Sequence, residues 1–261
     1  MKKMKQMAVL FAAATLILSC SKDDKYNPPA PPAIVSSVVK ASGDITGALT
    51  QFRGLLGDSL NTTPGKTGGR REVNWDGVPV GNTNNNTFPL DFFNNTDANG
   101  PVGRKRGLVY AAGTTLRIDS SDFAELDASN ANEFDAFSPK KILAPVGTNV
   151  TEAIFKVPGT TTDAFVKGFG VILVDVDDAN ATTLEFFNGA KSLGVFKAPV
   201  RTTTGFSFLG VFFPNEKITR VKITAGNGVL ATGIKDISAG GTKDLVVMDD
   251  FFYDEPKQAA N

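Results

Sequence analysis

The stretch Glu185-Phe186-Phe187-Asn188-Gly189-Ala190 decides the fold class of this chain. Asn-Gly between two strand-like runs is the strongest short-range signal for a β-hairpin, because glycine tolerates the positive φ of tight hairpin turns. Short runs rich in Phe and Val lie on both sides of it, separated by Gly, Asn, Pro and Thr. The runs that we predict to be strands are 107–111, 115–118, 151–157, 165–175, 182–187, 192–198, 206–213, 217–225 and 244–253.

No long helical pattern follows residue 60. Short strands with frequent turns and no helices between them are typical of antiparallel sandwiches. The sequence therefore predicts an all-β fold over residues 71–256, an antiparallel β-sandwich of jelly-roll type. Residues 257–261 are assigned to a C-terminal tail.

One short helical segment precedes the predicted strands. Ile45, Leu49, Phe52 and Leu56 recur at steps of three and four residues, which places them on one face of a helix over about 44–57. We interpret this apolar face as core packing. Residues 34–70 are assigned to the helical segment and the loop that follows it.

The N-terminal residues 1–19 have the pattern of a signal peptide. A lysine-rich start precedes an apolar run over 8–18, which is too short to span a bilayer as a helix. Ile17-Leu18-Ser19-Cys20 resembles a bacterial lipobox, and this resemblance implies cleavage before Cys20 and lipid attachment to it. A proline-rich tether over 20–33 then follows, with Asn27-Pro28-Pro29-Ala30-Pro31-Pro32 favouring an extended conformation.

The location of the protein follows from this segment. Ser21-Lys22-Asp23-Asp24 resembles the surface-export signal of lipoproteins in Bacteroidetes-type bacteria. We expect a chain that is anchored by its lipid in the bacterial outer membrane and faces the cell surface. The inner leaflet of that membrane is the alternative.

The composition excludes several classes of function. The 261 residues include no His and one Cys, so Cys/His zinc clusters and Ser-His-Asp catalytic groups are excluded. The 27 basic residues balance 27 acidic ones, which gives no overall positive field, and we expect no nucleic-acid partner. The oligomeric state is left open.

The only tryptophan stands beside a carboxylate, as Trp75-Asp76. We favour a core tryptophan in a strand that ends at Gly77. In the alternative, Trp75 stacks on a sugar ring and Asp76 accepts hydrogen bonds from its hydroxyl groups.

Two acidic clusters interrupt or follow apolar runs. Asp249 and Asp250 lie inside the run 245–253, where strand alternation predicts that they point to opposite faces. Asp175, Asp177 and Asp178 follow the run 171–174. A carboxylate buried in such a place needs a partner.

Two kinds of partner are available for these carboxylates. We favour arginines, and Arg70, Arg71 and Arg117 are candidates. The alternative is Ca²⁺, which takes oxygen ligands and therefore suits a domain without histidine.

Several motifs resemble those of a family of exported bacterial proteins of uncharacterised function. The match begins at Gly69-Arg70-Arg71-Glu72-Val73-Asn74-Trp75-Asp76-Gly77 and closes at Val246-Val247-Met248-Asp249-Asp250-Phe251, over about residues 50–256. The second half is similar to jelly-roll domains of anchored surface proteins and carbohydrate-binding modules. That resemblance implies that the closing strand lies beside the opening one, with Trp75 near Asp249 and Asp250. It implies no assigned reaction.

These observations predict a surface-tethered lipoprotein with a non-catalytic binding or adhesion role, and a glycan as the ligand. A glycoside hydrolase that uses two carboxylates is one alternative. A purely structural envelope lipoprotein is the other.

Overall fold

The predicted hairpin is present in the smaller of two antiparallel sheets. In the computed structural model, which describes residues 33–202 and 205–258, β9 (Thr183–Asn188) pairs with β10 (Lys191–Lys197). Asn188 lies opposite Lys191, so Gly189 and Ala190 form the turn. Gly189 has a φ of +58°, which glycine adopts without steric cost.

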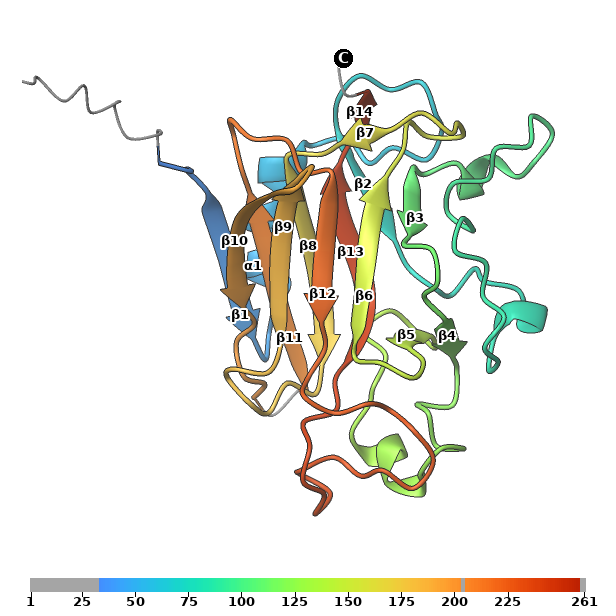
Figure 1. Cartoon of the computed structure of the whole chain (residues 1–261), viewed down its shortest axis with the longest axis vertical. Coiled ribbons are helices and arrows are strands. Elements are labelled where there is room, and N and C mark those ends of the chain that lie inside the picture. Colours follow the sequence, from blue (N-terminus) through green and yellow to red (C-terminus); the bar gives the residue numbers. More distant parts are fainter. Residues whose placement is uncertain (1–32, 203–204, 259–261) are drawn as a thin grey trace, which may run out of the picture. The chain divides into compact units, whose positions relative to one another are not determined.

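Two main sheets form the described domain (Figure 1), and a third sheet has only two strands, β7 (Ala164–Phe165) and β14 (Lys257–Gln258). The larger has the order β1-β11-β8-β13-β5-β4, with β2 also paired to β13, and the smaller has the order β10-β9-β12-β6-β3. Their remaining strands are β1 (Ser37–Ser42), β2 (Arg70–Val73), β3 (Leu108–Tyr110), β4 (Leu116–Asp119), β5 (Ile142–Pro145), β6 (Val150–Phe155), β8 (Gly168–Val174), β11 (Phe206–Phe212), β12 (Arg220–Thr224) and β13 (Val247–Asp254).

The order of the strands is that of a jelly roll. Eight strands give the order β2-β13-β8-β11 in one sheet and β6-β12-β9-β10 in the other. Along the chain they alternate between the two sheets except at the β9–β10 hairpin, which is the pattern of two nested Greek keys. The predicted antiparallel β-sandwich of jelly-roll type is therefore confirmed.

The core between the sheets follows from strand alternation. In β6, every second residue is buried and faces the opposite sheet. In β8 all seven residues are buried, because one face meets the smaller sheet and the other is covered. The aromatic residues Phe155, Phe169, Phe186, Phe213 and Phe251 belong to this core.

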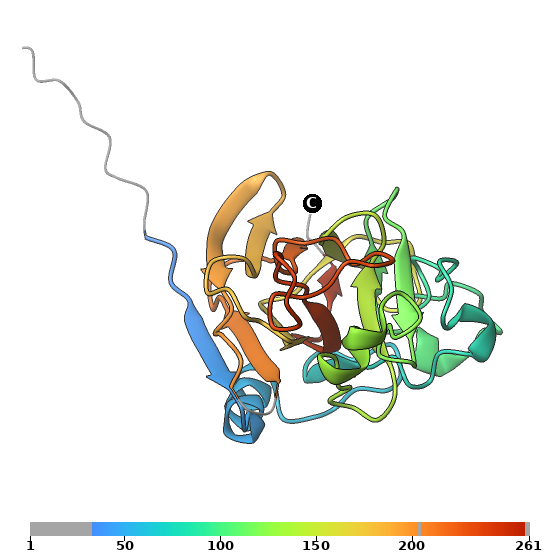
Figure 2. The same cartoon turned by 90° about the horizontal axis from the view of Figure 1, so that it is seen from below.

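The predicted helix is present as α1 (Thr46–Leu56) and covers the outer face of the larger sheet (Figure 2). Its residues Leu49, Phe52 and Leu56 are buried, as the spacing predicted. Glycines make this approach close: a Cβ on Gly170 would lie 2.7 Å from the Phe52 ring, and one on Gly210 equally 2.7 Å from it. Glycine at these strand positions therefore admits the helix.

The structure adds elements that the sequence analysis did not predict. β1 lies in the 34–70 region, which was assigned to a helix and loop, and it pairs with β11 at the edge of the sheet. β5 was missed, and the predicted strand 165–175 is divided into β7 (Ala164–Phe165) and β8. The expected tail contains β14 (Lys257–Gln258), which pairs with β7. Short 3-10 turns occupy Val80–Asn82, Val102–Arg104 and Ala128–Asn132.

The signal peptide over 1–19, Cys20 and nearly all of the tether lie outside the described residues. Ile34–Asn261 form one compact unit of the chain. Within the described residues, no helix is long and apolar enough to cross a membrane.

Candidate functional site

Strand alternation divides the motif at residues 69–77 between the core and a groove. Arg71, Val73 and Trp75 are buried, whereas Glu72 and Asn74 line the groove. β2 pairs with β13 in an antiparallel register that sets Val73 opposite Phe251. The strands that contain the first and last matched motifs, β2 and β13, are therefore neighbours, as the resemblance implied.

Trp75 belongs to the core. Its side chain has no exposed surface, and its ring makes edge contacts with Phe251 and Phe93 at centroid distances of 5.2 and 5.6 Å. A ring enclosed in this way offers no face to a sugar, so the stacking alternative is wrong for this structure. Asp76 is half-buried, and its backbone carbonyl accepts a hydrogen bond from Lys141.

Arg71 holds the motif in place through a buried ion pair. Its guanidinium donates two hydrogen bonds to Glu255, at 2.8 and 2.7 Å, and both side chains are almost fully buried. Asn61 donates a further hydrogen bond to Glu255 at 2.8 Å. Two-pronged pairs of this kind are strong and geometrically specific. Arg71 is thus an arginine partner as predicted, but its carboxylate is Glu255 and not one of the predicted aspartates.

An open groove of about 450 Å³ runs beside β2. Its walls combine carboxylates, guanidinium groups, an amide and aromatic rings. The lining residues are Leu60, Thr62, Glu72, Asn74, Gly77, Phe92, Phe93, Gly103, Arg104, Arg106 and Asp250. The sequence analysis named Asp250 as a buried carboxylate and possible Ca²⁺ ligand, but it did not predict the groove.

A β-bulge brings Asp249 and Asp250 together. Between Met248 and Phe251, three steps along β13 face two steps along β8, so β13 carries one extra residue. The prediction that the two aspartates point to opposite faces is wrong for this reason. Both carboxylates contact Ser138, whose Oγ lies 3.0 Å from Asp249 Oδ1 and 2.9 Å from Asp250 Oδ1.

The two aspartates share one side-chain donor. The backbone N–H groups of Phe137 and Ser138 point at Asp249 Oδ2, at 2.6 and 3.3 Å, but the Ser138 hydroxyl has a single proton for Asp249 Oδ1 and Asp250 Oδ1 together. Burial, followed by the neighbouring Asp250, raises the pKa of Asp249 to about 8. Burial also raises the pKa of Asp250. The pair therefore keeps a proton at neutral pH.

Glu72 has the opposite character. Arg53 of α1 donates two hydrogen bonds to it at 2.8 Å, and Arg70 donates one at 2.7 Å. Burial acts to raise the pKa of Glu72, but the hydrogen bonds from the two arginines outweigh it and the pKa is lowered. The groove thus contains one firmly ionised carboxylate and one that shares a proton.

The second predicted cluster is present at the end of β8, with additional members. Asp175 and Asp177 lie beside Glu133, Asp236 and Asp244 in two groups whose carboxylate oxygens lie within 4.8 Å of one another. These are Glu133 with Asp175 and Asp236, and Asp177 with Asp236 and Asp244. Such buried acidic groups could hold a metal ion.

The sequence analysis placed this cluster correctly but not its boundaries. Asp178 is not a member, because its carboxylate accepts a hydrogen bond from the backbone of Asn180 in a local turn. Glu133, Asp236 and Asp244 were missed. The available signal was the long segment 225–246 between two strands, since loops of that length inside a domain usually have a function.

Arg201 is the arginine of this cluster. Its Nε lies 2.6 Å from Asp177 Oδ1 and 2.7 Å from Asp175 Oδ1, and its Nη2 lies 3.6 Å from Glu133. The favoured interpretation, pairing with an arginine, is therefore confirmed for Asp175 and Asp177, although one arginine serves both. The partner differs from the three arginines that the sequence suggested.

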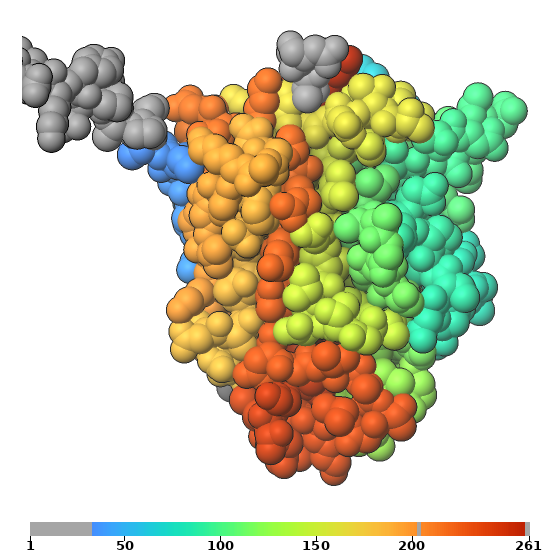
Figure 3. Space-filling model, in the orientation of Figure 1, coloured from blue at the N-terminus to red at the C-terminus, as the bar shows by residue number. Residues whose placement is uncertain are grey.

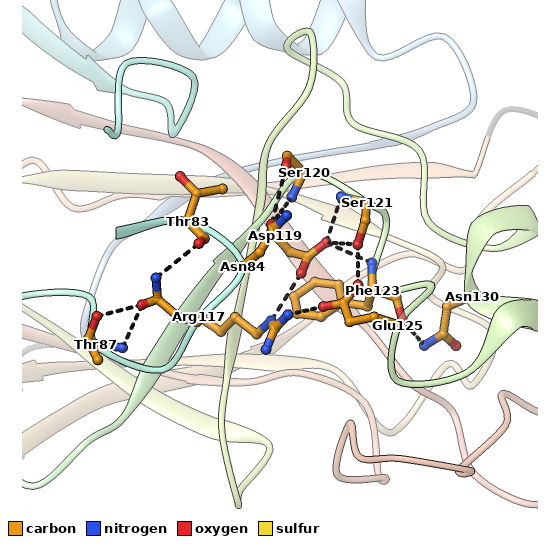
Figure 4. Close-up of polar contacts among 11 residues, drawn as sticks. Thr83, Asn84, Thr87, Arg117, Asp119, Ser120, Ser121, Phe123, Glu125 and Asn130 are labelled. Atoms are coloured by element: carbon orange, nitrogen blue, oxygen red, sulfur yellow. Dashed lines mark hydrogen bonds and ion pairs between the residues drawn. The ribbon is translucent and has the colours of Figure 1, made fainter. Parts of the chain in front are cut away.

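Arg117 pairs in a separate network that fixes the segment after β4 (Figure 4). It donates to Asp119 at 3.0 Å and also contacts Glu125. Asp119 is fully buried and accepts further bonds from the backbone of Ser121 and Phe123, at 2.7 and 2.9 Å. This network fixes the conformation of the segment before Glu133 and Ser138. Glu133 lies beside Asp175 and Asp236, and Ser138 contacts Asp249 and Asp250.

Comparison with known proteins assigns no family. No family model and no curated protein matches the chain. Among solved structures, the chain is similar to the CBM22-1 xylan-binding domain from Paenibacillus barcinonensis Xyn10C, at 12% identity and a TM-score of 0.27, over 66% of this chain and 94% of that one. At this level the similarity identifies no ligand, and the jelly-roll description rests on the strand order of the chain itself.

Proposed function

We propose that this protein is a lipid-anchored protein of the bacterial outer membrane whose jelly-roll domain binds a glycan without chemical conversion. The proposed location in the membrane rests on the sequence that ends at Cys20 and on the proline-rich tether after it. The binding role rests on one observation, the composition of the groove beside β2.

The groove offers each kind of contact that a sugar uses. Sugar hydroxyl groups donate to carboxylates such as Asp250 and accept from guanidinium and amide groups such as Arg106 and Asn74. The apolar C–H face of a sugar packs on apolar surface, which the exposed side chain of Leu60 supplies here. A few convergent polar groups on a partly apolar wall are typical of small-ligand sites.

The polar groups of the groove are held in place before any ligand arrives. Two arginines fix Glu72, as described above. Arg106 donates to the carbonyl of Gly103 at 2.8 Å, and Arg104 lies over the ring of Phe92 at 4.0 Å from its centroid. Binding then costs less ordering entropy, which favours a recognition role.

A glycan array tests the binding role. The full chain, in mild detergent, is expected to retain a subset of glycans, and Asn74→Ala and Arg104→Ala are expected to weaken that binding about tenfold or more, as the loss of one good polar contact predicts. Asn215→Ala is the matched control, because Asn215 is exposed at the turn between β11 and β12 and does not line the groove. Equal binding by all three variants would remove the groove from the proposal.

The lipid anchor has its own test. Cells fed with a labelled fatty acid are expected to label the chain, and Cys20→Ala is expected to remove the label. Proteolysis of intact cells then separates exposure at the surface from the inner leaflet. An unlabelled chain would contradict the anchor and leave the groove proposal standing.

Hydrolysis is the second candidate, because two carboxylates of unequal pKa line the same groove. Such inequality is how acid and base roles are divided in glycoside hydrolases. Against hydrolysis, both carboxylate oxygens of Glu72 already accept hydrogen bonds from Arg53 and Arg70. The measurement is the release of reducing ends from a glycan that the chain binds on the array. Release by the wild-type chain that Asp250→Asn abolishes would establish hydrolysis. Binding without product would support the non-catalytic role.

A further inference from the structure

The acidic cluster at the end of β8 is formed by three segments of the chain. None of them contributes to the groove beside β2. Asp175 and Asp177 follow β8, Glu133 follows the 3-10 turn at Ala128–Asn132, and Asp236 and Asp244 belong to the segment 225–246. This segment is the orange-red mass at the lower end of Figure 3. Backbone contacts confirm the neighbourhood, since Gly233 donates to the carbonyl of Leu126.

The cluster has more acceptors than donors. Arg201 Nε faces both Asp175 and Asp177, and its single proton makes a well-formed hydrogen bond only to Asp177. The Ser238 hydroxyl likewise faces both Glu133, at 2.6 Å, and Asp236, at 2.8 Å. Two side-chain protons are therefore shared among four carboxylates, of which Asp236 also accepts backbone hydrogen bonds from Ser238 and Leu245, at 2.8 and 2.6 Å.

Three buried oxygens of the cluster accept no hydrogen bond within the described residues, namely both oxygens of Asp175 and Oδ2 of Asp244. Asp175 Oδ1 has only the ion pair with Arg201 Nε, at 2.7 Å. Asp175 and Asp244 have no exposed surface. A buried carboxylate oxygen without a partner is costly, and either a proton or a cation removes that cost.

The spacing of the oxygens favours a cation. Ca²⁺ binds oxygen at 2.3–2.6 Å, so oxygens in one coordination shell lie up to about 5 Å apart. The two groups of carboxylates meet this limit and share Asp236. Mg²⁺ dehydrates reluctantly and is rarely held by carboxylates of the protein alone. Ca²⁺ thus fits the donor set better.

We propose that this cluster binds Ca²⁺ through Asp175, Asp177, Asp236 and Asp244, with Glu133 beside them, and that the ion fastens the segment 225–246 to the end of β8. The ion supplies the positive charge that Arg201 alone does not. This site is independent of the glycan groove, so either proposal can fail without the other.

The first experiment compares the full chain in millimolar CaCl₂ and in EGTA. A ligand at about a hundred times its Kd raises the Tm of a domain of this size by about 5 °C or more. Trypsin cleavage after Lys235 and Lys243, which are exposed in the segment, is expected to slow about tenfold or more with Ca²⁺.

Two variants and a matched control place the ion. Asp236→Asn and Asp244→Asn are expected to lose the Ca²⁺-dependent differences in Tm and in cleavage rate. Asp178→Asn is expected to keep both, because Asp178 lies outside the cluster. If the two test variants fail to fold, metal analysis of the wild-type chain after gel filtration in Ca²⁺ still decides, with about one ion per chain expected.

The proposal is overturned if the chain retains no Ca²⁺ and its Tm and cleavage rate are equal in CaCl₂ and EGTA. In that case protons satisfy the cluster, and the Tm in EGTA falls as the pH rises. A response to MgCl₂ without a response to CaCl₂ would overturn the identity of the ion.

Discussion

Asp249 and Asp250 are adjacent in the sequence, yet both carboxylates point at the Ser138 hydroxyl, at 3.0 and 2.9 Å. Regular strand geometry forbids this, and the bulge in β13 permits it. The pair stands where the closing strand meets the groove, with Glu72 and Asp76 as further acidic neighbours and Arg53 as the facing cation.

The stability of the domain should fall as the pH rises because of this pair. The pKa of Asp249 is raised from 3.8 to about 8, so between these values the native state binds more protons than the unfolded state. Its contribution is fully present below pH 3.8, decreases from there, and is lost as the pH passes about 8. One such proton changes the free energy of unfolding by about 1.4 kcal/mol per pH unit.

Asp249→Asn is the test of that slope. An amide mimics the protonated carboxyl group: its oxygen can accept from the backbone of Phe137, and its nitrogen can donate towards Ser138. Thermal melts from pH 5 to pH 8.5 should show a smaller slope for the variant and a higher Tm than wild type at pH 8.5. An unchanged slope would mean that Asp249 is ionised in the native state.

The glycines under α1 should be intolerant of a methyl group. Gly170→Ala places a Cβ 2.7 Å from the Phe52 ring and 2.9 Å from the Phe208 ring, and overpacking of this kind costs about 1–3 kcal/mol. Gly54→Ala on the exposed side of α1 is the control, because its Cβ meets nothing within 4 Å. That change should stabilise the domain by about 1 kcal/mol. Urea unfolding measures both.

The buried pair of Arg71 and Glu255 should show strong coupling. Arg71→Met leaves Glu255 buried without its cation and should cost about 3–5 kcal/mol. Adding Glu255→Gln should recover part of that loss, since the second change removes the uncompensated charge. A double-mutant cycle by urea unfolding measures the coupling, and simple additivity would contradict it.

The single tryptophan provides a direct test of its burial. Trp75 is enclosed, so the native chain should emit at short wavelength and resist quenching by iodide. Unfolding should remove both properties. Ready quenching of the native protein would mean that Trp75 is exposed, and the sugar-stacking interpretation would then apply again.

The strands, the hairpin and α1 could be predicted because each depends on local periodicity. Phe52 and Leu56 follow the helical spacing, and Asn188-Gly189 marks its own turn. β1 escaped prediction because it is an edge strand in which only Val39 is buried. A strand with one buried residue lacks the run of apolar residues by which the others were recognised.

The candidate sites were only partly predictable, for the same physical reason. Asp175, Asp177 and Asp250 stand out as charges beside apolar runs. Glu133 and Asp244 do not, because they join the cluster only when the fold brings separate segments together. The bulge at Asp249 was also invisible, since it is defined by the register against β8.

The most direct test of the central claim is chemical-shift mapping of an array-positive glycan on the ¹⁵N-labelled chain. We predict shifts at Asn74, Arg104, Arg106 and Asp250 along the groove beside β2, and none in the segment 225–246. Shifts confined to the exposed face of the sheet β10-β9-β12-β6-β3, or an array on which no glycan binds, would contradict the claim.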